Sequence, residues 1–270
     1  MTSSKTLPSA WEAFPAWLRQ WREHACLVLL LDFDGTLAPI VERPEDAAMP
    51  AATRVALERL LGRADVEAAL ISGRGMADAR ERAALPGIAY AGNHGMEIQG
   101  PGVERIHPDA KAARPALERV IDALAAPLGE IPGAILEDKG LTLSIHDRMV
   151  APERRAEIAG LVRQCVEGEA ELRITEGKRV REVRPRSDWH KGKAVDFLLD
   201  ELAPPAGAPV LYLGDDTTDE DAFGVLRARD VNGGGFLFAE APLPFTLAGW
   251  TLRDPAEVGR FLATLADATG

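Results

Sequence analysis

Two hydrophobic patterns alternate along the chain. Almost continuously apolar runs occur at 27–33, 66–71 and 209–213, and such runs are typical of parallel strands buried on both faces. Elsewhere, apolar side chains recur at the spacing of amphipathic helices. Helices are therefore predicted at 11–23, 52–61, about 76–84, 191–201 and 218–229, with a last one capped by Asp254, and short strands at 88–91, 235–238 and 247–252. The alternation favours the α/β class, with a doubly wound, Rossmann-like parallel sheet.

The middle of the chain follows a different order. Two helices are predicted at 108–128 and 152–167, each followed by a pair of strands around a short turn, at 134–137 with 141–146 and at 172–175 with 179–183. This αββαββ unit of α+β type is large enough to bury a small core of its own. We therefore expect a core domain formed by 1–102 and 186–270, and an inserted cap domain formed by 103–185.

Polar side chains follow each of the long apolar runs. The first run ends in Asp32 and Asp34, the second in Ser72, and the third is followed by three more aspartates, at 215, 216 and 219. One such cluster is ordinary turn composition, but the carboxyl ends of parallel strands meet at one sheet edge, where ligands bind. Carboxylates gathered there call for a cation, and hard oxygen donors favour Mg2+ over zinc. Mg2+ beside an aspartate nucleophile is an arrangement for phosphoryl transfer.

Composition narrows the class of protein further. The 270 residues carry 42 acidic and 31 basic side chains, a net charge of -11, which disfavours nucleic acid as a partner. A hydrophobic content of 46% excludes a mainly disordered chain. The longest fully apolar run, 26–31, is too short to cross a membrane, no signal peptide is recognisable, and two cysteines cannot form a disulfide framework. We expect a soluble cytoplasmic protein.

Four segments resemble the motifs of the haloacid dehalogenase superfamily of phosphatases. They are 32–37 (DFDGTL), 72–74 (SGR), 191–192 (KG) and 214–219 (GDDTTD), and the inserted domain stands where that superfamily carries its C2 cap. Further segments resemble the trehalose-6-phosphate phosphatase family: 92–97 (GNHGME), 136–139 (LEDK), 177–185 (GKRVREVRP) and 214–223 (GDDTTDEDAF). One departure is HDR at 146–148, where the family often has HYR.

The resemblance implies catalytic roles for four side chains. Asp32 would be the nucleophile, and Asp34 the general acid and base that protonates the leaving oxygen and then activates water. Ser72 would donate a hydrogen bond to a phosphate oxygen, and Lys191 would pair with Asp32 and the phosphate.

The resemblance also implies a Mg2+ site. Its protein ligands would be the carboxylates of Asp32 and Asp215 and the backbone carbonyl of Asp34. Asp216 and Asp219 would orient water molecules or Lys191 instead of binding the metal directly.

Three charged residues of the cap are candidates for sugar recognition. Glu137 and Lys139 are two residues apart and share a face, and Glu182 lies on the other strand pair. From the residues alone, a cross-strand salt bridge on a solvated sheet is the favoured interpretation. The resemblance implies that they bind the glucose unit distal to the phosphate.

Three core residues are further candidates for substrate contact. The resemblance implies that Asn93 and His94, which follow a short strand near the expected hinge, touch the substrate. For Arg74 a salt bridge and an outer phosphate contact remain equally open.

The expected function is Mg2+-dependent hydrolysis of trehalose 6-phosphate to trehalose and phosphate through an aspartyl-phosphate, the last step of trehalose biosynthesis. The expected partner is a small-molecule sugar phosphate, and a functional association with trehalose-6-phosphate synthase is a further hypothesis. One alternative is a phosphatase of another sugar phosphate, such as sucrose phosphate or glucosylglycerol phosphate. An alternative of another class is a catalytically silent sugar-phosphate sensor.

Overall fold

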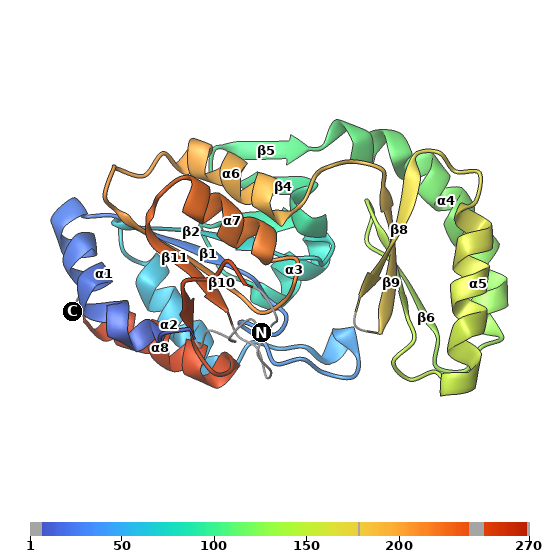
Figure 1. Ribbon diagram of the computed structural model, residues 1–270, viewed down its shortest axis with the longest axis horizontal. Helices are drawn as coiled ribbons and strands as arrows, with labels where there is room; N and C mark the ends of the chain where they lie inside the picture. Colours follow the sequence, from blue (N-terminus) through green and yellow to red (C-terminus); the bar gives the residue numbers. More distant parts are fainter. Residues whose placement is uncertain (1–6, 178, 238–245, 269–270) are drawn as a thin grey trace, which may run out of the picture.

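The structure is a computed structural model that describes residues 7–177, 179–237 and 246–268. It has two parts, shown side by side in Figure 1: a large sheet covered by helices, and a smaller sheet backed by two helices. Within the described residues, no helix is both long enough and apolar enough to cross a membrane.

Within the described part of the chain, the large sheet has eight strands. They are β1 (Leu27–Leu31), β2 (Val66–Ile71), β3 (Ala89–Gly92), β4 (Glu97–Gly100), β5 (Val103–Ile106), β10 (Pro209–Gly214), β11 (Asn232–Leu237) and β12 (Trp250–Thr251). Their order is β12-β11-β10-β1-β2-β3-β4-β5, parallel from β12 to β3 and antiparallel from β3 to β5. The three long apolar runs thus form adjacent central strands. Strand β12 is shorter than predicted, and Phe238 of the predicted 235–238 strand lies outside the described residues.

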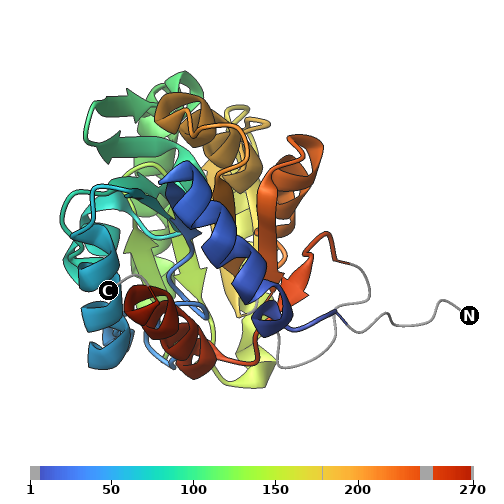
Figure 2. The same cartoon turned by 90° about the vertical axis from the view of Figure 1, so that its left-hand side faces the viewer.

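Helices cover both faces of this sheet, which confirms the doubly wound class. The first face carries α1 (Ala10–His24), α2 (Ala51–Leu61), α3 (Met76–Ala83) and α8 (Pro255–Asp267), and the second carries α6 (Lys191–Leu202) and α7 (Glu220–Ala228). In β1, Leu27, Leu29 and Leu31 pack on the first face while Val28 and Leu30 pack on the second. A continuous apolar run is therefore what two buried faces require. Figure 2 shows α1 and α8 together on the first face.

The hairpin β4–β5 was not predicted. Its two strands are short and contain both polar and apolar residues, and several of its side chains are half-buried or exposed, which is typical of the edge of a sheet. Strand β5 begins at residue 103, where the cap was expected to begin, yet it is hydrogen-bonded to β4 in the large sheet. We propose that the chain passes from core to cap only after β5.

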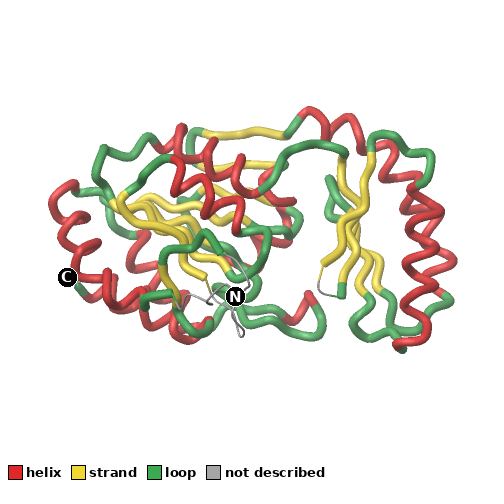
Figure 3. The backbone as a smooth tube through the Cα atoms, viewed as in Figure 1, coloured by secondary structure: helices red, strands yellow, loops and turns green. Residues whose placement is uncertain are grey.

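The cap has the predicted αββαββ order. It contains α4 (Pro108–Gly129), β6 (Ile135–Asp138), β7 (Leu143–His146), α5 (Arg155–Val166), β8 (Leu172–Gly177) and β9 (Val180–Pro185). Its antiparallel sheet, in the order β6-β7-β9-β8, packs one face on α4 and α5 around a separate apolar cluster. Figures 1 and 3 show these helices on the side away from the core, so the other face of the cap sheet is directed toward the large sheet.

Candidate active site

The central strands bring the predicted residues to one edge of the large sheet. Asp32 directly follows β1, Ser72 directly follows β2, and Asp215 directly follows β10. Strand β1 lies between β2 and β10. The helices that lead into these two neighbours, α2 and α6, lie on opposite faces of the sheet. Such a switch point leaves a crevice at the carboxyl ends of the strands, which is where open α/β sheets bind ligands.

Lys191 joins two of the carboxylates in this crevice. It is the first residue of α6, only 3% exposed, and its Nζ donates to Asp32 Oδ1 at 2.8 Å and to Asp219 Oδ1 at 2.7 Å. Burial alone would lower the pKa of Lys191, but Asp219 and Asp32 outweigh it and raise that pKa well above its usual value. The lysine is therefore a permanent cation beside Asp32.

Asp219 organises the loop after β10. Its Oδ2 accepts the backbone N–H groups of Asp215 at 2.9 Å and Asp216 at 3.0 Å, and its Oδ1 also accepts the Tyr212 hydroxyl at 2.6 Å. With the bond from Lys191, both oxygens of Asp219 are already engaged. Asp216 is exposed and accepts from Thr218. These contacts fit the prediction that Asp219 orients Lys191.

The carboxylates exceed the positive charge available to them. Asp32, Asp215 and Asp219 each place an oxygen within 4.8 Å of the others. Burial, together with Asp216 and Asp219, raises the pKa of Asp215 to about 8. Burial also raises the pKa of Asp32 well above its usual range, with Lys191 opposing and neighbouring carboxylates adding to the rise.

This donor set fits a hard divalent cation. The crowded oxygens would be stabilised by a positive charge that Lys191 alone does not supply. Since Asp219 is saturated by protein donors, Asp32 and Asp215 are the better candidates for ligands.

Ser72 is placed to offer a proton. Its Oγ, in a residue only 1% exposed, accepts the backbone N–H of Arg74 at 3.2 Å. Because that bond uses an acceptor lone pair, the hydroxyl hydrogen remains available for a phosphate oxygen.

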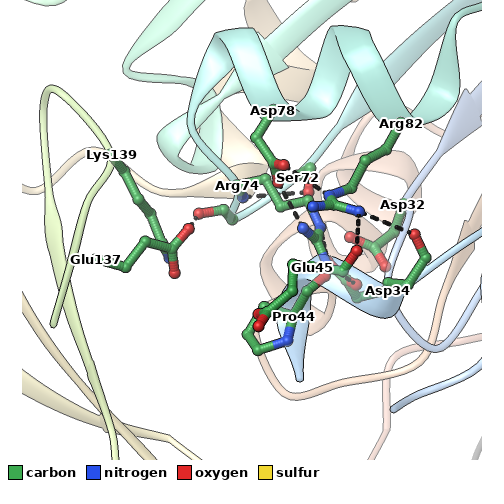
Figure 4. A network of polar contacts seen from close by, with 12 residues as sticks. Asp32, Asp34, Pro44, Glu45, Ser72, Arg74, Asp78, Arg82, Glu137 and Lys139 are labelled. Carbon is green, nitrogen blue, oxygen red and sulfur yellow. Dashed lines mark hydrogen bonds and ion pairs between the residues drawn. The ribbon is translucent and has the colours of Figure 1, made fainter. Parts of the chain in front are cut away.

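Arg74 forms the salt bridge that was one of its two open interpretations. Its Nε and Nη2 each lie 2.7 Å from an oxygen of Asp34, so the pair is bidentate (Figure 4). Its Nη1 donates to Asp78 at 2.5 Å and its Nη2 also donates to the Pro44 carbonyl at 2.9 Å. Asp78 was not predicted as a partner, because Arg74 lies before the predicted helix 76–84 and the spacing of side chains within a helix does not apply to it.

On the cap side, Lys139 and Glu182 form a buried ion pair. Lys139 Nζ lies 2.8 Å from Glu182 Oε1, with side-chain exposures of 9% and 15%, and it also donates to the Gly73 carbonyl of the core at 3.0 Å. Burial would raise the pKa of Glu182, but Lys139 and His94 hold it well below its usual value. The pair therefore exists, but in the interface between core and cap and not on a solvated face.

Glu137 lies in the same cross-strand row as Glu182. It is paired in register with Ser144, which is in turn paired with Glu182. Glu137 Oε2 lies 2.7 Å from His146 Nε2. Figure 4 shows Glu137 and Lys139 beside the residues that follow β1 and β2, so the row faces the crevice.

Asn93 and His94 differ in what they leave free. Both polar atoms of the Asn93 side-chain amide contact the cap. Its Nδ2 donates to the Lys139 carbonyl at 3.1 Å, and its Oδ1 accepts from Thr142 at 2.7 Å. His94 Nε2 lies 3.2 Å from Glu182, whereas its buried Nδ1 has no partner. Burial lowers the pKa of His94, with Glu182 partly opposing, so a neutral ring that donates from Nε2 presents an acceptor at Nδ1.

The sequence analysis predicted no role in the site for Arg184. This residue is only 7% exposed, and its buried Nε and Nη2 have no hydrogen-bond partner among the described residues. It lies two residues after Glu182 on β9 and therefore on the same face, which was the available signal. Buried donors without partners are typical of positions that a polar ligand or water completes.

The doubly wound sheet with an inserted cap is the fold of haloacid dehalogenase-like hydrolases, and the acidic crevice lies at the carboxyl edge of that sheet. A haloacid dehalogenase-like hydrolase from Bacteroides thetaiotaomicron has the same fold, with a TM-score of 0.61 and 14% identity over 91% of this chain and 100% of that chain. Within this class, the profile described as trehalose-phosphatase matches residues 30–242, and the chain belongs to that family.

Individual relatives agree with this assignment. The chain is 39% identical to the trehalose-phosphate phosphatase of Mycobacterium avium over 244 residues, which are 88% of this chain and 62% of that protein. It is also similar to the C-terminal domain of Candida albicans trehalose-6-phosphate phosphatase, with a TM-score of 0.78 and 24% identity over 98% of this chain and 99% of that chain. The chain thus spans about three fifths of the mycobacterial relative's length.

Proposed function

We propose that this protein hydrolyses trehalose 6-phosphate to trehalose and phosphate. The observation that carries the proposal is the meeting of Asp32, Ser72 and Lys191 at one sheet edge, opposite the buried Lys139–Glu182 pair of the cap. Such an arrangement pairs phosphoryl-transfer chemistry with a polar surface suited to hydroxyl groups. Membership of the trehalose-phosphatase family supports it.

In the first step, Asp32 attacks phosphorus. An Asp32 oxygen forms the new P–O bond while the bond to the sugar oxygen breaks, and Asp34, which must enter this step protonated, gives its proton to the sugar oxygen. Ser72 and Lys191 donate to the phosphoryl oxygens as the negative charge redistributes. The products of this step are trehalose and an aspartyl-phosphate on Asp32.

In the second step, water releases the phosphate. Asp34, now ionised, takes a proton from a water molecule that attacks phosphorus, and Asp32 leaves as a carboxylate. Mg2+ held by Asp32, Asp215 and the Asp34 carbonyl would neutralise charge on the transferring group. Asp219 keeps Lys191 and the 215–216 backbone in place for both steps.

The cap row supplies the proposed sugar contacts. Glu137, Lys139 and Glu182 would bind the glucose unit distal to the phosphate, and His94 Nδ1 would accept from a hydroxyl group. For Asn93 and Arg74, contact with substrate would require breaking the bonds they make in this structure. A cytoplasmic location and an association with trehalose-6-phosphate synthase stay predictions.

The test is phosphate release from trehalose 6-phosphate, sucrose phosphate, glucosylglycerol phosphate and glucose 6-phosphate, each with Mg2+ and with chelator. We expect a strong preference for trehalose 6-phosphate that chelator abolishes. Asp32→Asn should abolish turnover of every substrate, because an amide does not form the acyl phosphate.

The cap variant separates the alternatives. Glu182→Gln should reduce kcat/KM for trehalose 6-phosphate at least tenfold more than for a small aryl phosphate, because an aryl phosphate has no sugar hydroxyl groups for the cap to bind. Preference for another sugar phosphate would keep the chemistry and reject the substrate. Binding of trehalose 6-phosphate without any turnover would favour the silent sensor.

A further inference from the structure

We propose that Asp78 is a positioning residue for catalysis, which orients the general acid and base Asp34 through the guanidinium of Arg74. The inference rests on the proposed function in taking Asp34 as the proton donor. It concerns Asp78, on the first turn of α3, for which the family resemblance implied no role.

The guanidinium of Arg74 is held on three sides. Asp34 occupies Nε and one hydrogen of Nη2, the Pro44 carbonyl accepts from Nη2, and Asp78 accepts from Nη1. The side chain is only 7% exposed, and its guanidinium carbon lies 5.5 Å from the centre of the Phe33 ring. With so few alternatives, the direction of Nε and Nη2 is fixed by Asp78 and Pro44.

Asp78 is itself fixed. Its Oδ1 accepts from Arg82 Nε at 2.6 Å, one turn further along α3. Arg82 also donates to the carbonyls of Glu45 at 2.7 Å and Ala47 at 3.2 Å, in the segment that contains Pro44. The chain of contacts from Arg82 through Asp78 and Arg74 to Asp34 is visible in Figure 4.

Asp34 depends on this support more than Asp32 does. Its side chain is 36% exposed, and both of its oxygens face Arg74, whereas Asp32 is 5% exposed and bonded to Lys191. The carboxyl group of Asp34 must first give a proton to the sugar oxygen and then take one from a water molecule, so its orientation must be well defined. Small misplacements of such groups cost about 100-fold in rate. We infer that Asp78 fixes this orientation through Arg74 without touching the substrate.

The experiment compares two leaving groups in single-turnover reactions with enzyme in excess. A sugar alkoxide needs a proton to leave, whereas nitrophenolate does not. We expect Asp78→Ala to slow formation of the aspartyl-phosphate from trehalose 6-phosphate about 10- to 100-fold, with KM within about twofold. The same step with p-nitrophenyl phosphate should change less than about threefold, and Asp78→Glu should restore part of the loss.

A double-mutant cycle shows whether Asp78 acts through Arg74. In an Arg74→Ala background, Asp78→Ala should cost no further rate with either substrate. Glu81→Gln, which removes a charge from an exposed position of the same helix, is the matched control and should leave both rates unchanged. Thermal unfolding of each variant shows whether it is folded. If Asp78→Ala is misfolded, Asp78→Asn is used in its place.

Three results would overturn the proposal: an equal loss with both leaving groups, a loss confined to KM, or a loss that persists in the Arg74→Ala background. If trehalose 6-phosphate is not a substrate, the wild-type protein releases no phosphate from it. The double-mutant cycle is then run with the sugar phosphate that the wild-type protein hydrolyses best in the substrate panel. Failure of the proposed function and failure of this inference are therefore distinguishable.

Discussion

Gly35 lies between the acid/base candidate Asp34 and the metal-ligand candidate Asp215. Its φ of +81° is in the left-handed region, and a Cβ built on it would come within 2.0 Å of Asp215 Oδ2. Any other residue would be strained there and would push the carboxylate away. At this position, backbone freedom and space for a carboxylate are both required.

Gly35→Ala should therefore weaken Mg2+ binding. Displacing Asp215 removes one proposed ligand, so we expect the Mg2+ concentration for half-maximal activity to rise at least tenfold, as measured by titrating the metal.

Gly87→Ala is the matched control for this change. Gly87 has a similar φ of +74°, but nothing lies within 4 Å of the built Cβ. The control should lose roughly 1 kcal/mol of stability from the backbone strain and keep the wild-type Mg2+ dependence. Similar Mg2+ titrations for both variants would contradict this role of Gly35.

At the scale of elements, helix ends follow local rules that are written in the sequence. Asp254 Oδ1 accepts the backbone N–H of Glu257 at 2.7 Å, and Pro255 occupies the first turn of α8. Ser9 and Glu12 form a capping box at the start of α1. Both helices pack on the large sheet, so their caps stabilise the core domain.

Asp254→Ala should lower the free energy of unfolding by about 1 kcal/mol, because one N–H at the start of α8 loses its partner. Urea unfolding measures the change, and Asp254→Asn, which keeps the acceptor, should lose much less. Phosphatase activity should stay at the wild-type level in both, since α8 lies away from the crevice. Equal losses in the two variants would exclude the capping explanation.

At the scale of the whole molecule, buried polar groups join the cap to the core. His94 of the core contacts Glu182 of the cap, and Lys139 of the cap contacts the Gly73 carbonyl of the core. Since these groups are mostly buried, their protonation is linked to stability. The pH dependence of unfolding therefore reports on this interface.

Acidification below about pH 6.5 should destabilise the protein through His94. Burial lowers the pKa of His94 in the folded state. At pH values between that pKa and about 6.5, the unfolded chain therefore binds a proton at His94 that the folded chain does not bind. Stability therefore falls with falling pH, by at most about 1.4 kcal/mol per pH unit for one proton.

Glu182 acts in a lower window. Its pKa is depressed in the folded state, so its contribution is present above about pH 4.5 and is lost as the pH falls through the folded value. Urea unfolding of the wild type and of His94→Gln between pH 5 and 8 tests the first window. We expect a shallower slope below about pH 6.5 in the variant, and identical slopes would rule out His94 as the source.

The α/β class, the order of helices and strands in the smaller sheet, and the expectation that Asp32, Ser72 and Asp215 share one sheet edge could all be derived from the sequence. These features follow from local rules: a run buried on both faces must be a central strand, and parallel strands bring their carboxyl ends to one edge. The β4–β5 hairpin was not predicted, because its edge strands are short and partly polar and therefore lack a strong hydrophobic pattern.

The partners of the charged side chains could not be derived from the sequence and became known from the folded structure. Arg74 had two interpretations until Asp34, Asp78 and Pro44 were seen around its guanidinium. The Lys139–Glu182 pair could be solvated or buried until the cap was placed against the core. Long side chains reach in many directions and choose partners that are distant in sequence, so spacing along the chain does not specify their contacts. The packing of the two domains does, because burial makes each remaining hydrogen bond obligatory.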